Sequence, residues 1–144
     1  METLRGVATY RPLSDFELAK VSDGLRVASH LLDLDQPADI DDLQVLYDVL
    51  LSDPARPASA VEALGFAFGQ VLLEQEWLEW AMLLDEEFGD EISVAVRDRR
   101  LGCSPLSMIK NRLEDGEAWS LIELRESTVR RLRQLGQHAS LNVR

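Results

Sequence analysis

The sequence has a single cysteine among its 144 residues, Cys103. One cysteine excludes an internal disulfide framework, and so low a content is typical of proteins in a reducing compartment. No apolar run approaches the roughly 20 residues that a membrane-spanning helix needs. The first residues, Met1 to Gly6, lack the apolar core of a signal peptide. We therefore expect a soluble cytoplasmic protein that does not bind membranes.

Positive charge is scarce in the first 90 residues. This part contains 19 acidic and 5 basic side chains, a balance of −14, whereas residues 91–144 contain 7 acidic and 10 basic ones, a balance of +3. A strongly negative surface repels nucleic-acid phosphate and anionic lipid, and it attracts cationic partners. We therefore expect a basic protein partner and no nucleic acid. Solubility alone is the other explanation for such a charge.

The rest of the composition is that of an ordinary globular domain, with 46% hydrophobic and 28% charged residues. A domain of this length buries about two-thirds of its unfolded surface, so its stability requires neither a metal nor a disulfide. The sequence has no glycine-rich phosphate loop, no zinc-ligand spacing and no Gly-x-Ser-x-Gly nucleophile motif. We therefore expect no cofactor, no bound metal and no catalytic residue.

Hydrophobic spacing predicts three helices in the first half of the chain. The first begins at a capping box of Ser14 and Glu17 and runs to about residue 32. After a break, the second has an apolar stripe of Ile40, Leu43, Tyr47 and Leu50. A proline-containing connector then leads to the third helix, which we expect to start at a capping box of Ser59 and Glu62.

Two glycines, Gly65 and Gly69, stand four residues apart in the middle of the third predicted helix. A glycine in a helix interior costs up to about 1 kcal/mol relative to alanine. We therefore expect another element to pack closely against this face of the helix.

From Trp77 onward the hydrophobic period changes to two. Residues 77–84 and 92–97 both alternate, and the polar loop between them, Asp85 to Asp90, contains Gly89. This pattern predicts a β-hairpin over about residues 77–97. Because two strands alone are marginally stable in water, we expect helices to cover the hairpin or a third strand to join it, from residues 7–10 or 99–103.

Two further helices complete the prediction. Ser104 and Pro105 are typical of a helix start, and this short helix ends near Gly116. The last helix spans about residues 117–135, with Gly136 as its C-cap and residues 137–144 as a tail. We predict a mostly helical α+β fold in one domain, with five helices packed around a small antiparallel sheet. Residues 1–55 form a helical extension that packs on the core of residues 56–136.

About half of the chain, residues 62–132, resembles the bacterial DUF3806 domain family of unknown function. The resemblance rests on a small-residue helix followed by an ordered set of positions, Trp80, Asp85, Gly89, Pro105, Lys110, Arg112 and Glu117. It implies a small α+β unit in which these residues have structural roles, and it implies no catalytic residues. Where the family pattern has an arginine beside the lysine, this chain has Asn111. The departure puts a paired-cation role in question.

A charged cluster after Pro105 has two interpretations. Its members, Lys110, Arg112, Glu114 and Glu117, either contact an anionic ligand or form an ion-pair network that fixes the scaffold. Asp85 is the candidate carboxylate partner for Arg112, since guanidinium pairs bidentately with carboxylate. We favour the structural interpretation.

Other residue groups have weaker functional interpretations. The five carboxylates of residues 85–91 do not follow the spacing of an EF-hand loop, so we predict a solvated hairpin tip without metal. A nucleophilic Cys103 would need His30 or His138 as its base, and a buried thiol is the better expectation. Four arginines on the last helix form a basic patch that we expect to face the acidic half or solvent, at Arg125, Arg130, Arg131 and Arg133.

Two functional hypotheses follow. The first is a non-enzymatic acidic domain that binds a basic partner protein, as a bacterial immunity or adaptor protein would. Its contact surface would come from Asp33, Asp35, Asp39, Asp41, Asp42 and Asp48, with Glu86 and Glu87. The second is a small ligand-binding or enzymatic domain with an anion-contacting cleft near Lys110 and Arg112. The sequence does not indicate an oligomeric state.

Overall fold

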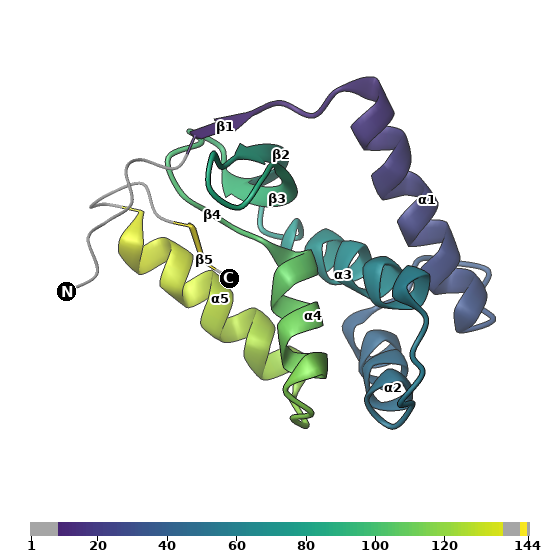
Figure 1. Ribbon diagram of the computed structural model, residues 1–144. Helices are drawn as coiled ribbons and strands as arrows, with labels where there is room; N and C mark the ends of the chain where they lie inside the picture. Colours follow the sequence, from purple (N-terminus) through teal and green to yellow (C-terminus); the bar gives the residue numbers. More distant parts are fainter. Residues whose placement is uncertain (1–8, 137–141, 144) are drawn as a thin grey trace.

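The protein has an α+β fold of five helices and a small sheet, as the sequence predicted (Figure 1). The computed structural model describes residues 9–136 and the backbone of residues 142–143. The elements in chain order are β1 (Thr9–Arg11), α1 (Asp15–Leu31), α2 (Ile40–Leu51), α3 (Ala58–Leu72), β2 (Leu78–Leu84), β3 (Glu91–Val96), β4 (Gly102–Cys103), α4 (Pro105–Glu114), α5 (Leu121–Leu135) and β5 (Asn142–Val143).

The predicted hairpin is the centre of the sheet, whose strand order is β1-β2-β3-β4-β5. β2 and β3 pair antiparallel, with Trp80 opposite Val94. Both candidate third strands exist, because β1 pairs antiparallel with β2 and β4 pairs antiparallel with β3. The first four strands therefore form an antiparallel sheet, and β5 adds a parallel edge beside β4. The rest of the predicted tail, and Val7 of the predicted strand, lie outside the described residues.

Helix α3 lies at the centre of the fold, between α1 on one side and α4 with α5 on the other (Figure 1). Ten of its 15 residues are buried, which is typical of a helix covered on all sides. A Cβ at Gly65 would lie 2.9 Å from Leu106 Cα, and a Cβ at Gly69 would lie 2.9 Å from Pro105 Cγ and would clash with the edge of the Trp80 ring. The expectation of a close neighbour at these glycines is confirmed.

One predicted helix start was wrong. Ser59 and Glu62 do not cap α3, which begins at Ala58 after Pro57 and has no side-chain cap. The Pro57 carbonyl instead accepts from the amides of Ala60 and Val61, both at 3.1 Å. The fixed φ of proline prepares the chain for the first turn, so the serine is not needed. The last helix also starts later than predicted, at Leu121, where Ser120 caps it through the Glu123 amide at 3.2 Å.

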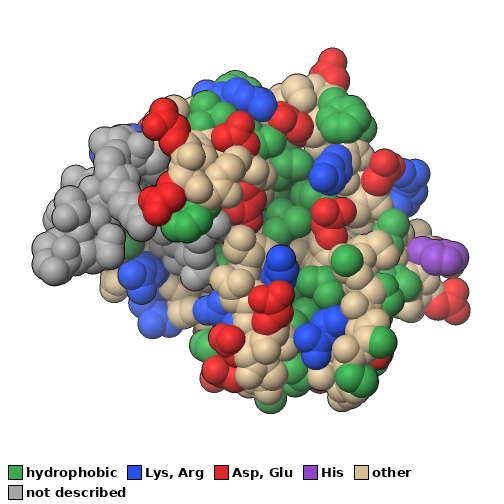
Figure 2. Space-filling view, in the orientation of Figure 1, with side chains coloured by type: hydrophobic (Ala, Val, Ile, Leu, Met, Phe, Trp, Pro, Cys, Tyr) green, Lys and Arg blue, Asp and Glu red, His purple; other side chains and the backbone are tan. Residues whose placement is uncertain are grey.

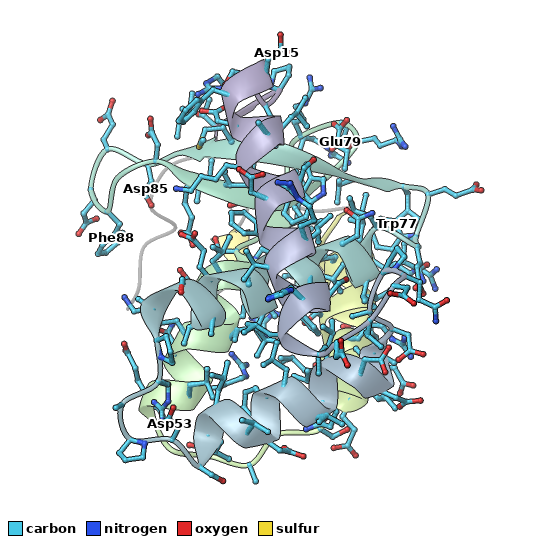
Figure 3. All side chains as sticks on the ribbon, turned by 90° about the vertical axis from the view of Figure 1, so that its right-hand side faces the viewer. Asp15, Asp53, Trp77, Glu79, Asp85 and Phe88 are labelled. Carbon is cyan, nitrogen blue, oxygen red and sulfur yellow. The ribbon has the colours of Figure 1, made fainter. Side chains whose placement is uncertain are left out.

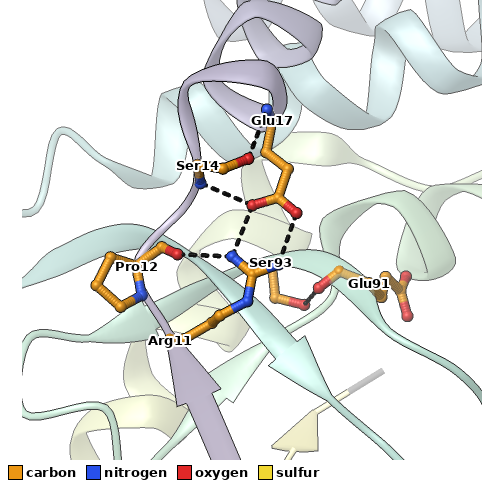
Figure 4. Close-up of polar contacts among 6 residues, drawn as sticks. All are labelled: Arg11, Pro12, Ser14, Glu17, Glu91 and Ser93. Atoms are coloured by element: carbon orange, nitrogen blue, oxygen red, sulfur yellow. Dashed lines mark hydrogen bonds and ion pairs between the residues drawn. The ribbon is translucent and has the colours of Figure 1, made fainter.

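The corner between β1 and α1 is held by a charged capping box (Figure 4). Arg11 donates to both carboxylate oxygens of Glu17, at 2.8 and 2.7 Å. Glu17 in turn accepts from the Ser14 amide at 2.7 Å, while its own amide donates to Ser14 Oγ at 3.2 Å. These donors, Arg11 first, lower the pKa of Glu17 to about 2. The predicted capping box is confirmed.

Polar side chains tie α2 to the segment between α4 and α5. Gln44 donates to the Trp119 carbonyl at 2.9 Å and accepts from the Leu121 amide at 2.7 Å. The Tyr47 hydroxyl donates to the Glu117 carbonyl at 2.7 Å, and burial raises the pKa of this phenol. Arg56 donates to the carbonyls of Leu50, Leu51 and Leu113 at the ends of α2 and α4.

Helix α2 contacts α3, α4 and α5, so it packs directly on the predicted core. The predicted boundary at residue 55 between an extension and a core stays a prediction.

Candidate functional site

The acidic face comprises Asp33, Asp35, Asp39, Asp41, Asp42 and Asp48, on α2 and its connection to α1. The connection begins where α1 ends in a Schellman motif. The Leu34 amide donates to the Ser29 carbonyl at 2.9 Å, and the Asp33 amide donates to the His30 carbonyl at 3.0 Å. Asp33 has a φ of 55°, in the left-handed region where glycine is the usual residue. A carboxylate here also faces the negative end of the α1 dipole.

The start of α2 explains three other carboxylates. Asp39 accepts from the Asp42 amide at 2.9 Å, and Asp42 accepts from the Asp39 amide at 3.0 Å. Asp41 lies in the same first turn. Negative groups at this position are favoured by the positive end of the helix dipole, so helix initiation accounts for these three acids in part.

The carboxylates of the acidic face form no ion pair with the described residues. All six carboxylates are exposed except that of Asp42, which is half-buried. None of the ion pairs formed among residues 9–136 includes any of them. Asp48 accepts a hydrogen bond from Gln44 at 3.0 Å, which is a neutral contact. No ion pair among the described residues therefore neutralises these six carboxylates.

Two exposed apolar side chains lie beside these acids on the outer side of α2. Val45 is 56% exposed and Val49 is 59% exposed. They are four residues apart, so they lie on one face of the helix, next to the line of Asp41 and Asp48. The sequence-based predictions did not include this pair. Both valines fall outside the predicted buried stripe of the helix, so their exposure could have been predicted.

A hollow of about 710 Å³ lies beside the acidic face, bounded by α1, the α1–α2 connection and α3. Its lining includes Leu25, His30, Leu34, Asp35, Ala38 and Ala67. The lining therefore combines apolar side chains with Asp35, one of the six carboxylates, and with Arg26.

The hairpin tip is separate from the acidic face. Figure 3 shows Asp85 and Phe88 at the tip of the hairpin, which projects to one side of the molecule, away from α2 at the bottom of the view. Glu86 and Glu87 are exposed on this tip. The eight predicted partner-binding acids therefore do not form one surface.

The proposed pairing of Asp85 with Arg112 was wrong. Asp85 Oδ1 accepts from the amides of Glu87 and Phe88, at 2.9 and 3.0 Å, and closes the hairpin turn with Gly89 at a φ of 86°. A short polar residue at the start of a turn forms this local contact more easily than a long-range one.

Arg112 is held by neutral groups. Its guanidinium lies 4.6 Å from the ring centre of Trp119, and its Nη1 donates to the Met108 carbonyl at 3.1 Å. Lys110 is exposed, and Glu117 accepts from the Trp119 indole at 3.1 Å. Among the described residues, the predicted cluster with Glu114 therefore forms no ion-pair network, because Trp119 occupies the place of a charged partner.

The other family-motif residues have packing contacts. Trp80 meets Phe66 edge to face, with ring centres 6.2 Å apart, and its indole donates to Gln70 at 3.1 Å. Pro105 is the first residue of α4 and packs on Gly69. Ser104 precedes it without capping the helix, and its hydroxyl lies 3.4 Å from that of Ser93. These contacts agree with structural roles for Trp80, Gly89 and Pro105.

Three of the four arginines of α5 divide into two groups. Arg133 lies over the Trp77 ring at 5.3 Å and donates to Gln75 at 3.2 Å, which docks α5 on the α3–β2 connection. Arg130 and Arg131 instead line a hollow of about 410 Å³ between α4 and α5. Figure 2 shows Lys and Arg side chains gathered over the C-terminal half of α5. We call the hollow between α4 and α5 the arginine hollow. Its lining residues are Met108, Arg112, Ser127, Thr128, Arg130, Arg131, Gln134 and Leu135.

Reactive groups are not assembled elsewhere among the described residues. Cys103 is fully buried, and burial raises its pKa to about 12, so its thiolate is not available as a nucleophile. His30 lies on α1, and His138 lies outside the described residues. Within the described part of the chain, no group of three or more His, Cys, Asp or Glu side chains can hold a metal ion. None of the helices there is long and apolar enough to cross a bilayer.

Comparison with known proteins gives a family and a fold. The sequence model of a family described as "Domain of unknown function (DUF3806)" matches residues 39–124. The match begins at the N-cap of α2, earlier than the resemblance predicted, and ends within α5. No curated protein matches.

A crystal structure of a protein from Bacteroides thetaiotaomicron VPI-5482 has the same fold. The TM-score is 0.65, with 15% sequence identity over 89% of this chain, which spans 50% of the length of that protein. At this identity the likeness describes the fold alone, and it assigns no function to this chain.

Proposed function

This chain belongs to the DUF3806 family of unknown function, and from that premise we propose that it is a non-enzymatic domain whose acidic face binds a basic partner protein. The observation that carries the proposal is the exposed pair Val45 and Val49 beside Asp41 and Asp48. Exposed apolar side chains next to charges of one sign are typical of an interface with a complementary partner.

The two components have different physical effects. Burying a valine side chain contributes about 1.5 kcal/mol or more, so the apolar pair supplies affinity. The carboxylates attract a cationic surface before contact and speed association, and salt screens that attraction beyond about 8 Å at physiological ionic strength. The proposal therefore predicts a complex that forms faster at low salt.

Asp33 supports the same surface. A charged residue occupies a left-handed position at a helix C-terminus, where both backbone sterics and the helix dipole favour a neutral glycine. Departures from local preference are concentrated where function requires them. The hollow beside Asp35 extends the surface with a place for an apolar side chain of the partner.

The proposed surface does not include Glu86 and Glu87, because they lie between Asp85 and Phe88 on the hairpin tip, away from α2 (Figure 3). A bacterial immunity or adaptor protein of the cytoplasm is the role that we infer for such a domain. The net charge of −11 and the single cysteine support this role.

The test compares the acidic face with the hairpin tip. The immobilised wild-type chain, Asp41→Asn/Asp48→Asn and Glu86→Gln/Glu87→Gln are exposed to a lysate of the source organism at low salt. Retained proteins are identified, purified and titrated by calorimetry. We expect a basic protein whose dissociation constant rises roughly tenfold or more with the α2 variant and stays unchanged with the tip variant.

A second pair of variants tests the apolar contribution. Val45→Ser/Val49→Ser should weaken the purified complex, whereas Phe88→Ser, which changes an exposed apolar residue on the tip, should not. Retention of no basic protein at low salt, or equal weakening by the α2 and tip variants, would refute the proposal.

The second candidate function is a ligand-binding or enzymatic domain with an anion-contacting cleft at Lys110 and Arg112. One observation favours it, because Arg112 lines the arginine hollow. Lys110 is not among the lining residues, so this candidate requires a different set of binding side chains.

A further inference from the structure

We propose that the arginine hollow binds a phosphate group carried by a small molecule. The proposal goes beyond partner binding and does not depend on the acidic face. Arg112 of α4 and Arg130 and Arg131 of α5 line the hollow together. Guanidinium groups match the oxygen atoms of phosphate with two parallel hydrogen bonds each.

The composition of the lining is unusual for this chain. Acidic side chains outnumber basic ones by 26 to 15 in the whole sequence, yet the described lining has three arginines and no carboxylate. Residues 91–144, which supply all of it, have a balance of +3. A local positive field therefore persists in a protein that is negative elsewhere.

The three guanidinium groups are available to a ligand. Arg130 and Arg131 are exposed and take part in none of the ion pairs formed within residues 9–136. Arg112 is fixed by the Trp119 ring and the Met108 carbonyl, neither of which neutralises its charge. Its Nε is buried and has no hydrogen-bond partner. One positioned cation and two adjustable ones therefore share a concave surface.

Size and lining indicate more than a bare ion. A volume of about 410 Å³ lies within the roughly 300–1,000 Å³ of small-molecule sites. Met108 and Leu135 provide an apolar wall for the carbon part of a ligand, and Thr128 and Gln134 add neutral hydrogen-bonding groups. A long nucleic acid does not fit this description, because its other phosphates would meet the acidic surface.

Calorimetric titration at constant ionic strength tests the site, with inorganic phosphate and glycerol 3-phosphate as the two probes. We expect both to bind, and the ester to bind more tightly because it also contacts the apolar wall. Equal affinity for the two probes would contradict the proposed small-molecule phosphate and would indicate free phosphate as the ligand.

Matched variants locate the binding. Arg130→Gln/Arg131→Gln removes two charges from the hollow, and Lys110→Gln/Arg125→Gln removes two charges outside it. The first should weaken binding of either probe by roughly tenfold or more, and the second should leave it within about twofold. All four changed residues lie on the helix surface, and thermal unfolding checks that both variants fold.

Two further outcomes would overturn the inference that the arginine hollow binds a phosphate group. One is the absence of heat from either probe at millimolar concentrations. The other is equal weakening by the two variants, which would mean that net charge and not the hollow governs the interaction.

Discussion

The ring of Trp80 occupies the space that a side chain at Gly69 would need. A Cβ built at Gly69 lies well inside van der Waals contact of Trp80 Cη2 and 2.9 Å from Pro105 Cγ. Strand β2, helix α3 and the start of α4 therefore meet at a position where only glycine fits. Both contacting residues, Trp80 and Pro105, belong to the family pattern.

Gly69→Ala should destabilise the protein despite its higher helix propensity. Overpacking costs about 1–3 kcal/mol and the propensity gain is about 1 kcal/mol, so we expect a net loss of up to about 2 kcal/mol. Urea denaturation measures it. Trp80→Phe removes the part of the ring that clashes, so the double variant should lose less than the sum of the single variants. Strict additivity would contradict the contact.

Arg56→Met should loosen the ends of α2 and α4. The variant keeps the aliphatic stem and removes the donors to the carbonyls of Leu50, Leu51 and Leu113. Loss of a charged donor leaves helix C-termini unsatisfied, and we expect the free energy of unfolding to fall by about 1–3 kcal/mol. Arg26→Met, on the exposed side of α1, is the control and should change it by less than about 0.5 kcal/mol.

Glu17→Gln gives a pH-dependent effect. The pKa of Glu17 is lowered from 4.5 to about 2 in the folded protein, so its ionised form stabilises the fold above the unfolded pKa. This contribution falls as the pH drops from about 4.5 toward 2. Glutamine retains the capping geometry, so the difference in Tm between wild type and variant should be constant near neutral pH and shrink in that acid window. A difference that stays constant down to pH 3 would contradict the Arg11–Glu17 assignment.

Asp33→Gly separates stability from binding. Glycine relieves the left-handed backbone and removes a negative charge from the α1 C-terminus, so Tm should rise, with a gain of about 0.5–1 kcal/mol. Binding of the basic partner should weaken, because the acidic face loses a carboxylate. Asp33→Asn, which tolerates the same backbone, should weaken binding equally. Unchanged affinity in both variants would remove Asp33 from the surface.

Local patterns predicted the secondary structure of this chain well. Alternation around Trp80 and Val94 predicted the hairpin, because successive side chains of a strand point to opposite faces of the sheet. Gly65 and Gly69 indicated a close neighbour, because nothing else offsets their cost in a helix. The capping box at Ser14 was correct and the one at Ser59 was wrong, since Pro57 already starts α3.

Contacts between distant segments were not predictable in the same way. Arg112 lies over Trp119 and not beside Asp85, and this depends on how α4 turns into α5. The arginine hollow also depends on the angle between those helices. Sequence spacing placed Arg130, Arg131 and Arg133 in one patch, whereas packing directs Arg133 to Trp77 and the others to the hollow. The functional role of the predicted acids stays a prediction.

Hydrogen exchange of the purified complex tests the central claim most directly. We compare amide protection of the free chain with that of the chain bound to its basic partner. Binding through the acidic face should slow exchange in residues 33–51, which include Asp41, Val45 and Val49, and leave residues 85–90 unchanged. Protection confined to the hairpin tip, or to α4 and α5, would contradict it.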